Sequence, residues 1–210
     1  MKAEILAILD RSGSMSNCVA DTIRGYNGFL DSQKEEGAGW NDVRLTTILF
    51  DDRYEVLLQA VPMLETLPLT DREYFVRGNT ALYDAVGLTL TSAAERIGGL
   101  PAPARPENVV VLIITDGQEN ASRRFTAADV KRLVDDRKRA GWEFFFLGAE
   151  LDSFADADRM GIDRNRQAGF TKADSPSSYR HMSKSIKDYI KSGTVDENWD
   201  DGIKSGDKQP

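Results

Sequence analysis

The chain has 210 residues, of which 40% are hydrophobic, and its formal net charge is −7. This composition is sufficient for one α/β domain with a sizeable core, and it excludes a chain that is disordered throughout. The negative charge argues against a nucleic-acid backbone or an anionic membrane surface as the main partner.

Cysteine, histidine and long apolar segments are scarce. One cysteine, Cys18, excludes an internal disulfide and a multi-cysteine zinc site, and His181 is the only histidine. The first residues show no charged leader with a cleavage signature, and no stretch reaches the roughly 20 apolar residues of a membrane-spanning helix. We therefore expect a cytoplasmic protein without a membrane partner.

The first predicted strand is the apolar run Ile5–Leu9, which ends abruptly at Asp10. Apolar runs of this length are typical of strands buried on both faces of a parallel sheet. Such a strand delivers the residues after its carboxyl end to the crevice where open α/β sheets bind ligands. The residues delivered here include Asp10, Ser12 and Ser14, whose oxygen atoms suit a hard cation such as Mg²⁺.

The next segments predict a helix over residues 17–34 and two strands, Val43–Phe50 and Tyr54–Val61. The short acidic turn between the strands predicts a hairpin, and therefore an antiparallel edge of the sheet. The turn contains Asp51 and Asp52. A polar turn is the favoured interpretation of this pair, with a second cation site or catalytic carboxylates as the alternative.

The second half of the chain begins with a predicted helix whose apolar stripe starts at Leu82, and Thr80 lies where a hydroxyl normally caps a helix. The β-branched run Asn108–Thr115 predicts the central strand, which delivers Asp116 at its carboxyl end. A capping box at Thr126 predicts the next helix. The remaining predicted elements are strands at 142–147 and 167–170 and helices at 152–160 and about 177–191.

The final segment, residues 193–210, is mostly polar and shows no periodicity. We interpret it as a mobile tail that follows a domain of residues 1–192. Trp199 lies among acidic residues of this tail. A docking role for Trp199 is the alternative to a solvated terminus.

The alternation of strands and helices predicts a Rossmann-like, doubly wound α/β fold with a mostly parallel central sheet, one antiparallel edge strand and helices on both faces. Right-handed crossovers place the loops after Leu9 and Thr115 at one edge of this sheet. If the two strands are neighbours, the oxygen ligands that follow them cluster at this edge. Thr80, at the start of a helix packed on the same sheet, could add a further ligand. The predicted set is Asp10, Ser12, Ser14, Thr80 and Asp116.

These residues resemble the metal-ion-dependent adhesion site of von Willebrand factor type A domains. The resemblance rests on Asp10-x-Ser12-x-Ser14, on Thr80 at the start of a helix and on Asp116 in Thr-Asp-Gly, and it covers nearly the whole chain. The segments Phe50–Val56 and Phe146–Asp152 are more narrowly similar to stand-alone domains of this class from bacteria and phages.

The resemblance implies Mg²⁺, with Mn²⁺ or Ca²⁺ as alternatives, held by those five side chains. It implies a module that is not an enzyme and that binds an Asp or Glu carboxylate of a partner protein through the metal. Two alternatives are a Mg²⁺-dependent hydrolase or phosphatase and a structural domain without a functional metal. The hydrolase is disfavoured because Ser12 stands where a phosphatase with an Asp10 nucleophile would need a second acid.

Overall fold

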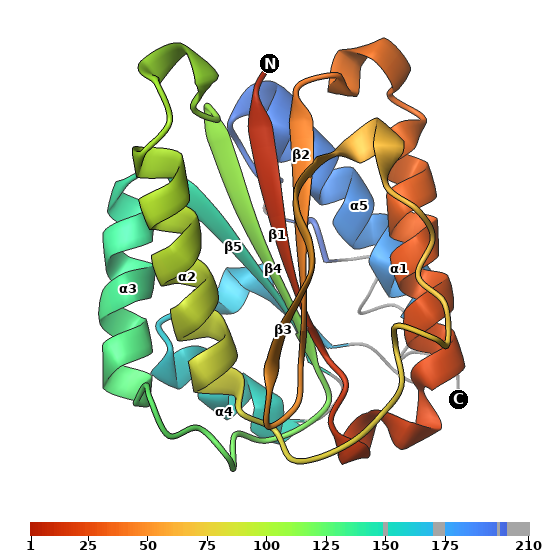
Figure 1. The fold of residues 1–210 in the computed structure, drawn as a ribbon, viewed down its shortest axis with the longest axis vertical. Helices are drawn as coiled ribbons and strands as arrows, with labels where there is room; N and C mark the ends of the chain where they lie inside the picture. The colour runs from red at the N-terminus through yellow and green to blue at the C-terminus, as the bar shows by residue number, and fades with distance from the viewer. Residues whose placement is uncertain (149–150, 170–174, 197, 201–210) are drawn as a thin grey trace.

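The computed structural model describes residues 1–148, 151–169, 175–196 and 198–200. Six strands form one sheet in the order β3-β2-β1-β4-β5-β6, and only β3 runs antiparallel to its neighbour (Figure 1). The strands are β1 (Ala3–Asp10), β2 (Val43–Phe50), β3 (Tyr54–Pro62), β4 (Asn108–Thr115), β5 (Trp142–Gly148) and β6 (Gln167–Gly169). The predicted fold class, including the antiparallel edge, is confirmed.

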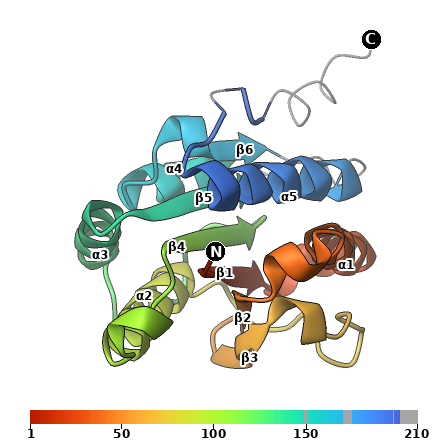
Figure 2. The same ribbon diagram turned by 90° about the horizontal axis from the view of Figure 1, so that it is seen from above.

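Helices cover both faces of the sheet, as Figure 2 shows. On one face lie α1 (Val19–Lys34) and α5 (Ser175–Ser192), and on the other lie α2 (Leu82–Gly98), α3 (Ala127–Arg139) and α4 (Leu151–Arg159). No helix in the described part of the chain has the length and apolar character needed to span a membrane. The sheet therefore separates two cores.

Every residue of β1 is buried, because this strand lies inside the sheet with a helical layer on each side. Leu6 and Ile8 face the core under α2, whereas Ile5 and Leu9 face the core under α1 and α5. This alternation follows from the two-residue repeat of a strand. It explains why the sequence of β1 is a continuous apolar run.

Close helix packing on one face depends on Gly25 of α1. A Cβ atom at Gly25 would lie 2.2 Å from the ring of Tyr179 in α5, well inside van der Waals contact.

On the other face, α3 begins with the predicted capping box. The Thr126 hydroxyl accepts from the backbone N–H of Asp129, and the Asp129 carboxylate accepts from the backbone N–H of Thr126.

The edge strand β3 contains a bulge at Ala60, whose φ of 50° lies in the left-handed region. Thr46 of β2 holds this conformation, since its hydroxyl accepts from the backbone N–H of Ala60 at 2.9 Å. Arg44 donates to the carbonyl oxygen of Ala60, also at 2.9 Å. Two side chains of the neighbouring strand therefore fix the bulge.

Part of the predicted tail contacts the domain. Trp199 is buried, and its ring packs edge-on against Phe145 of β5 with a centroid distance of 5.1 Å. The indole N–H donates to the carbonyl oxygen of Asn165. The boundary between residues 192 and 193 stays a prediction. Residues 201–210 of the tail, and Phe170 at the predicted end of the last strand, lie outside the described residues.

Candidate metal centre

The candidate site begins where two central strands end side by side. β1 and β4 are parallel neighbours, and their register pairs Leu9 with Ile114. Asp10 and Thr115 consequently leave the sheet together, and the Thr115 hydroxyl donates to Oδ2 of Asp10 at 2.5 Å. The two strands are therefore neighbours, which was the condition for the ligand cluster predicted from the sequence.

Three hydroxyl groups form a chain of contacts beside Asp10. The backbone N–H of Ser12 donates to Asp10 Oδ1 at 2.6 Å, which folds the loop back over the carboxylate. The Oγ atoms of Ser12 and Ser14 are 3.0 Å apart, and the Thr80 hydroxyl donates to Ser12 Oγ at 2.9 Å. Ser14 is the exposed member, whereas Asp10, Ser12 and Thr80 are buried. The cluster therefore opens to solvent at Ser14.

The fifth predicted ligand, Asp116, is also buried. Its Oδ2 lies 4.0 Å from the sulfur of Cys18, which is buried at the start of α1. Cys18 also donates to the carbonyl oxygen of Met15, so it is a packed residue of the loop that carries the serines. The neighbouring charge of Asp116 contributes to the electrostatics of Asp10.

The carboxyl group of Asp10 has a pKa above its usual value. Burial raises its pKa to about 6, and the charge of Asp116 acts in the same direction. The hydrogen bonds from Thr115 and Ser12 favour the ionised form and only partly offset these effects. A cation beside Asp10 would favour the carboxylate further, so the site suits a positively charged ligand.

Gly117 supplies a test of whether a metal ion fits among these residues. A Cβ atom there would lie 2.8 Å from Thr80 Oγ1, 2.9 Å from Ser14 Oγ and 3.5 Å from Asp10 Oδ2. One point beside Gly117 is therefore close to three oxygen atoms from two segments, the loop at the end of β1 and the segment just before α2, and glycine leaves it open. No group of three or more His, Cys, Asp and Glu side chains in the described residues could hold a metal. Binding here would depend on the hydroxyls, as hard-cation chemistry allows.

The capping role expected for Thr80 is wrong. α2 begins at Leu82 with Ala81 at the cap position, and no side chain caps it. Instead, the backbone N–H of Thr80 donates to Oδ1 of Asn120 at 2.9 Å, and the backbone N–H of Asn120 donates to the Thr80 carbonyl oxygen at 3.0 Å. This reciprocal pairing turns the Thr80 hydroxyl toward Ser12, and sequence reasoning missed Asn120.

Glu119 is a second residue that the sequence reasoning missed. Its carboxylate accepts from the backbone N–H groups of Tyr83, Ala121 and Ser122 at 2.7–2.9 Å, and from the Ser122 hydroxyl. It thereby ties the loop after β4 to the first turn of α2. The available signal was the polar pair Glu119-Asn120, which follows Asp116-Gly117 after the single residue Gln118.

Asp51 lies in the predicted polar turn, where its Oδ1 accepts from the backbone N–H of Arg53 at 2.8 Å, and it is also part of an ion-pair network. Its buried carboxylate accepts from Nε of Arg11 at 3.1 Å and from Nε of Arg77 at 2.6 Å. Burial opposes ionisation of Asp51, but the hydrogen bond from Arg77 and the Arg53 backbone N–H outweigh it and lower its pKa. Arg11 also pairs with Glu55. The side chain between Asp10 and Ser12 therefore points away from the candidate site and anchors its loop.

No family model matches the sequence, and no curated protein matches it. Solved structures match the fold. The von Willebrand domain of the type V pili tip protein Mfa5 from Porphyromonas gingivalis has a TM-score of 0.68 at 12% identity, covering 93% of this chain and 98% of that chain. Manganese-loaded TRAP protein from Plasmodium vivax has a TM-score of 0.58 at 13% identity, covering 83% and 70%.

A third neighbour is proximal thread matrix protein 1 of the mussel byssus, with a zinc-occupied metal-ion-dependent adhesion motif. Its TM-score is 0.58 at 14% identity, and the match covers 89% of this chain but 48% of that chain. The present chain thus spans nearly all of the Mfa5 domain and less than half of the mussel protein. At such identities the likeness concerns the fold, and this chain has the fold of von Willebrand factor type A domains.

Proposed function

We propose that the chain is a Mg²⁺-dependent protein-binding module that captures an Asp or Glu carboxylate of a partner protein. The observation that carries this proposal is the convergence of the Thr80 and Ser14 hydroxyls and the Asp10 carboxylate beside Gly117. The Ser12 hydroxyl contacts both of these hydroxyls. Asp116, delivered by the adjacent strand, completes the proposed ligand set. Mn²⁺ and Ca²⁺ are the alternative ions, and neighbours of the same fold are described with manganese or zinc.

The proposed ligands explain why the site would bind rather than catalyse. When bound, Mg²⁺ supplies a Lewis-acidic positive charge that prefers oxygen ligands. Ser12, Ser14 and Thr80 contribute oxygen atoms without charge, and only Asp10 and Asp116 are acids. An additional carboxylate from a partner would therefore be attracted to the opening beside the exposed Ser14.

The hydrolase alternative receives less support. Both oxygens of Asp10 accept hydrogen bonds, from the Ser12 backbone and from the Thr115 hydroxyl, so the carboxylate is held as a ligand rather than left mobile as a nucleophile. The position of a second acid is occupied by Ser12. We propose a non-catalytic module that works in the cytoplasm, related in function to stand-alone domains of bacteria and phages.

The test has a folding readout and a binding readout. Mg²⁺ should raise the melting temperature of the wild-type protein, and Asp10→Ala should abolish this increase, whereas the exposed-site control Asp71→Ala should retain it. Partner proteins captured in Mg²⁺ should be released by chelation and should not bind Asp10→Ala. An undiminished Mg²⁺ effect in Asp10→Ala would remove the metal assignment, and Mg²⁺-dependent ester hydrolysis lost in the same variant would favour the hydrolase.

A further inference from the structure

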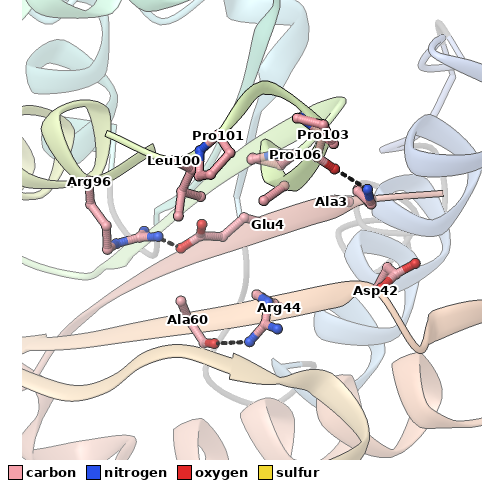
Figure 3. A pocket seen from close by; sticks show the side chains of 12 residues that line it. Ala3, Glu4, Asp42, Arg44, Ala60, Arg96, Leu100, Pro101, Pro103 and Pro106 are labelled. Atoms are coloured by element: carbon pink, nitrogen blue, oxygen red, sulfur yellow. Dashed lines mark hydrogen bonds and ion pairs between the residues drawn. The ribbon is translucent and has the colours of Figure 1, made fainter. Parts of the chain in front are cut away.

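A pocket of about 520 Å³ lies at the amino ends of β1 and β2. The candidate metal centre lies at the opposite, carboxyl ends of the parallel strands. Its lining comes from the start of β1, from β2 and the β3 bulge, from the end of α2 and from the proline-rich segment 100–106 (Figure 3). We propose that this pocket binds a small carboxylate that has an apolar body. The proposal is independent of the metal centre.

One wall of the pocket contains a buried acid whose charge is already compensated. Glu4 lies in β1 and accepts from the Thr46 hydroxyl at 2.7 Å. The guanidinium group of Arg96, from the last turns of α2, pairs with the same carboxylate, as Figure 3 shows. A buried acid with a cationic partner and a hydroxyl donor is satisfied. Glu4 and Arg96 therefore neutralise each other, and the net charge of the pocket depends on its other residues.

Two further cations line the pocket, and within the described residues neither forms an ion pair. Lys2 donates to the carbonyl oxygen of Pro103, and Arg44 donates to that of Ala60. A carbonyl oxygen accepts a hydrogen bond but does not neutralise a charge. Asp42, which is exposed, is the other acid of the lining. The pocket consequently has a net positive charge on a chain whose total is −7, and such local potentials attract anions.

The bulge at Ala60 brings backbone into the pocket in a conformation that alanine rarely adopts. Arg44 and Thr46 hold the carbonyl oxygen and the N–H of this residue. Left-handed conformations of non-glycine residues persist where surrounding contacts enforce them, and they are frequent at ligand sites. The guanidinium group of Arg44 thus carries the unneutralised charge and also holds the pocket wall at Ala60. This contact fixes the position of the guanidinium group before any ligand binds.

The remaining lining is apolar and defines the rest of the ligand. Leu100, Pro101, Pro103, Ala104 and Pro106 form one side of the pocket. Rings and short side chains of this kind pack against an aromatic or branched aliphatic body, and the volume lies within the usual range of small-molecule sites. The ligand class is thus a monoanionic carboxylate with a ring-sized apolar group, either a free acid or the carboxyl terminus of a peptide.

Backbone amide NMR with 3-phenylpropionate as the probe tests the proposal, with 3-phenylpropan-1-ol as its uncharged counterpart. The acid should shift the amides of Ala3, Ala60 and Leu100 saturably, and the alcohol should bind about tenfold more weakly. Arg44→Gln should weaken binding of the acid about tenfold, because one charge-assisted hydrogen bond is lost. Arg53→Gln, which removes the same charge from the β2–β3 turn at the other sheet edge, should have no effect.

A second variant, Ala104→Trp, adds a ring to an exposed lining residue and should block the pocket without altering either core. Equal affinity for acid and alcohol, unchanged binding in Arg44→Gln or Ala104→Trp, or the absence of saturable shifts would overturn the proposal. Peptides that end in phenylalanine, with a free or an amidated carboxyl group, distinguish a peptide terminus from a free acid. All shifts should persist under chelation, so failure of the metal proposal does not affect this result.

Discussion

Gly117→Ala separates metal binding from folding at the candidate centre. The new methyl group would lie 2.8 Å from Thr80 Oγ1 and 2.9 Å from Ser14 Oγ, where the proposed ion would approach these oxygens. Gly117 has no left-handed backbone, so alanine fits its conformation. Ser14 is exposed and its hydroxyl can rotate away. The buried Thr80 side chain must shift as well, so the metal-free variant should lose about 1–3 kcal/mol of stability, the usual cost of overpacking.

The expected magnitude follows from linkage. A Mg²⁺ concentration about 100-fold above the dissociation constant stabilises the folded wild type by about 2.7 kcal/mol. For a chain of 210 residues, this corresponds to an increase in melting temperature of about 5–10 °C. In Gly117→Ala the increase should fall to about 1 °C or less under the same conditions, because the added methyl group excludes the ion.

Differential scanning calorimetry with and without Mg²⁺ measures both quantities. Gly28→Ala is the matched control, since nothing lies within 4 Å of a Cβ atom at Gly28. This variant should keep the full Mg²⁺ effect. If Gly117→Ala also kept it, the ion would not bind at the point where the three oxygens converge, and the reasoning would be refuted.

Three further variants test the packing of the domain. Asp51→Asn leaves the buried guanidinium of Arg11 with only the half-exposed Glu55 as an acidic partner and should lower the free energy of unfolding by about 3 kcal/mol in urea titrations. Because the folded-state pKa of Asp51 is lowered, its contribution is present above the unfolded pKa and should vanish as the pH falls through the folded value, where wild type and variant should converge. Gly25→Ala should cost about 1–3 kcal/mol by forcing a methyl group into the Tyr179 ring, and wild-type stability would contradict the close helix contact. Trp199→Ala should cost about 3 kcal/mol in the same assay, and a negligible loss would mean that its contact with Phe145 contributes little.

The sequence predicted the sheet and its edge because each strand carries a local pattern. The continuous apolar run of β1 and the β-branched run of β4 reflect burial on both faces, which requires no knowledge of distant residues. The acidic turn between β2 and β3 similarly reflects local turn chemistry. Asp10 and Asp116 were predictable as site residues because both stand at the carboxyl ends of such strands.

The remaining features depend on contacts between distant segments. Asn120 acts on a residue 40 positions earlier, and Arg11 reaches Asp51 across the same separation, so no periodicity records either pair. Thr80 resembled a helix cap because a hydroxyl before a helix usually is one, but Ser12 competes for it. The polar composition around Trp199 concealed a packed aromatic ring.

The segments that carry the proposed ligands differ in how readily they unfold locally. Asp10 is the last residue of β1 and Asp116 directly follows β4. Both strands are buried and paired on both sides, so their amide hydrogens should exchange only on global unfolding. Thr80 lies in the connection of residues 66–81, which contains no helix or strand, and openings there require fewer contacts to break. The residence time of a bound ion would then be governed by the excursions of Thr80 rather than by the sheet. Hydrogen exchange at residues 79–81 would report on that rate directly.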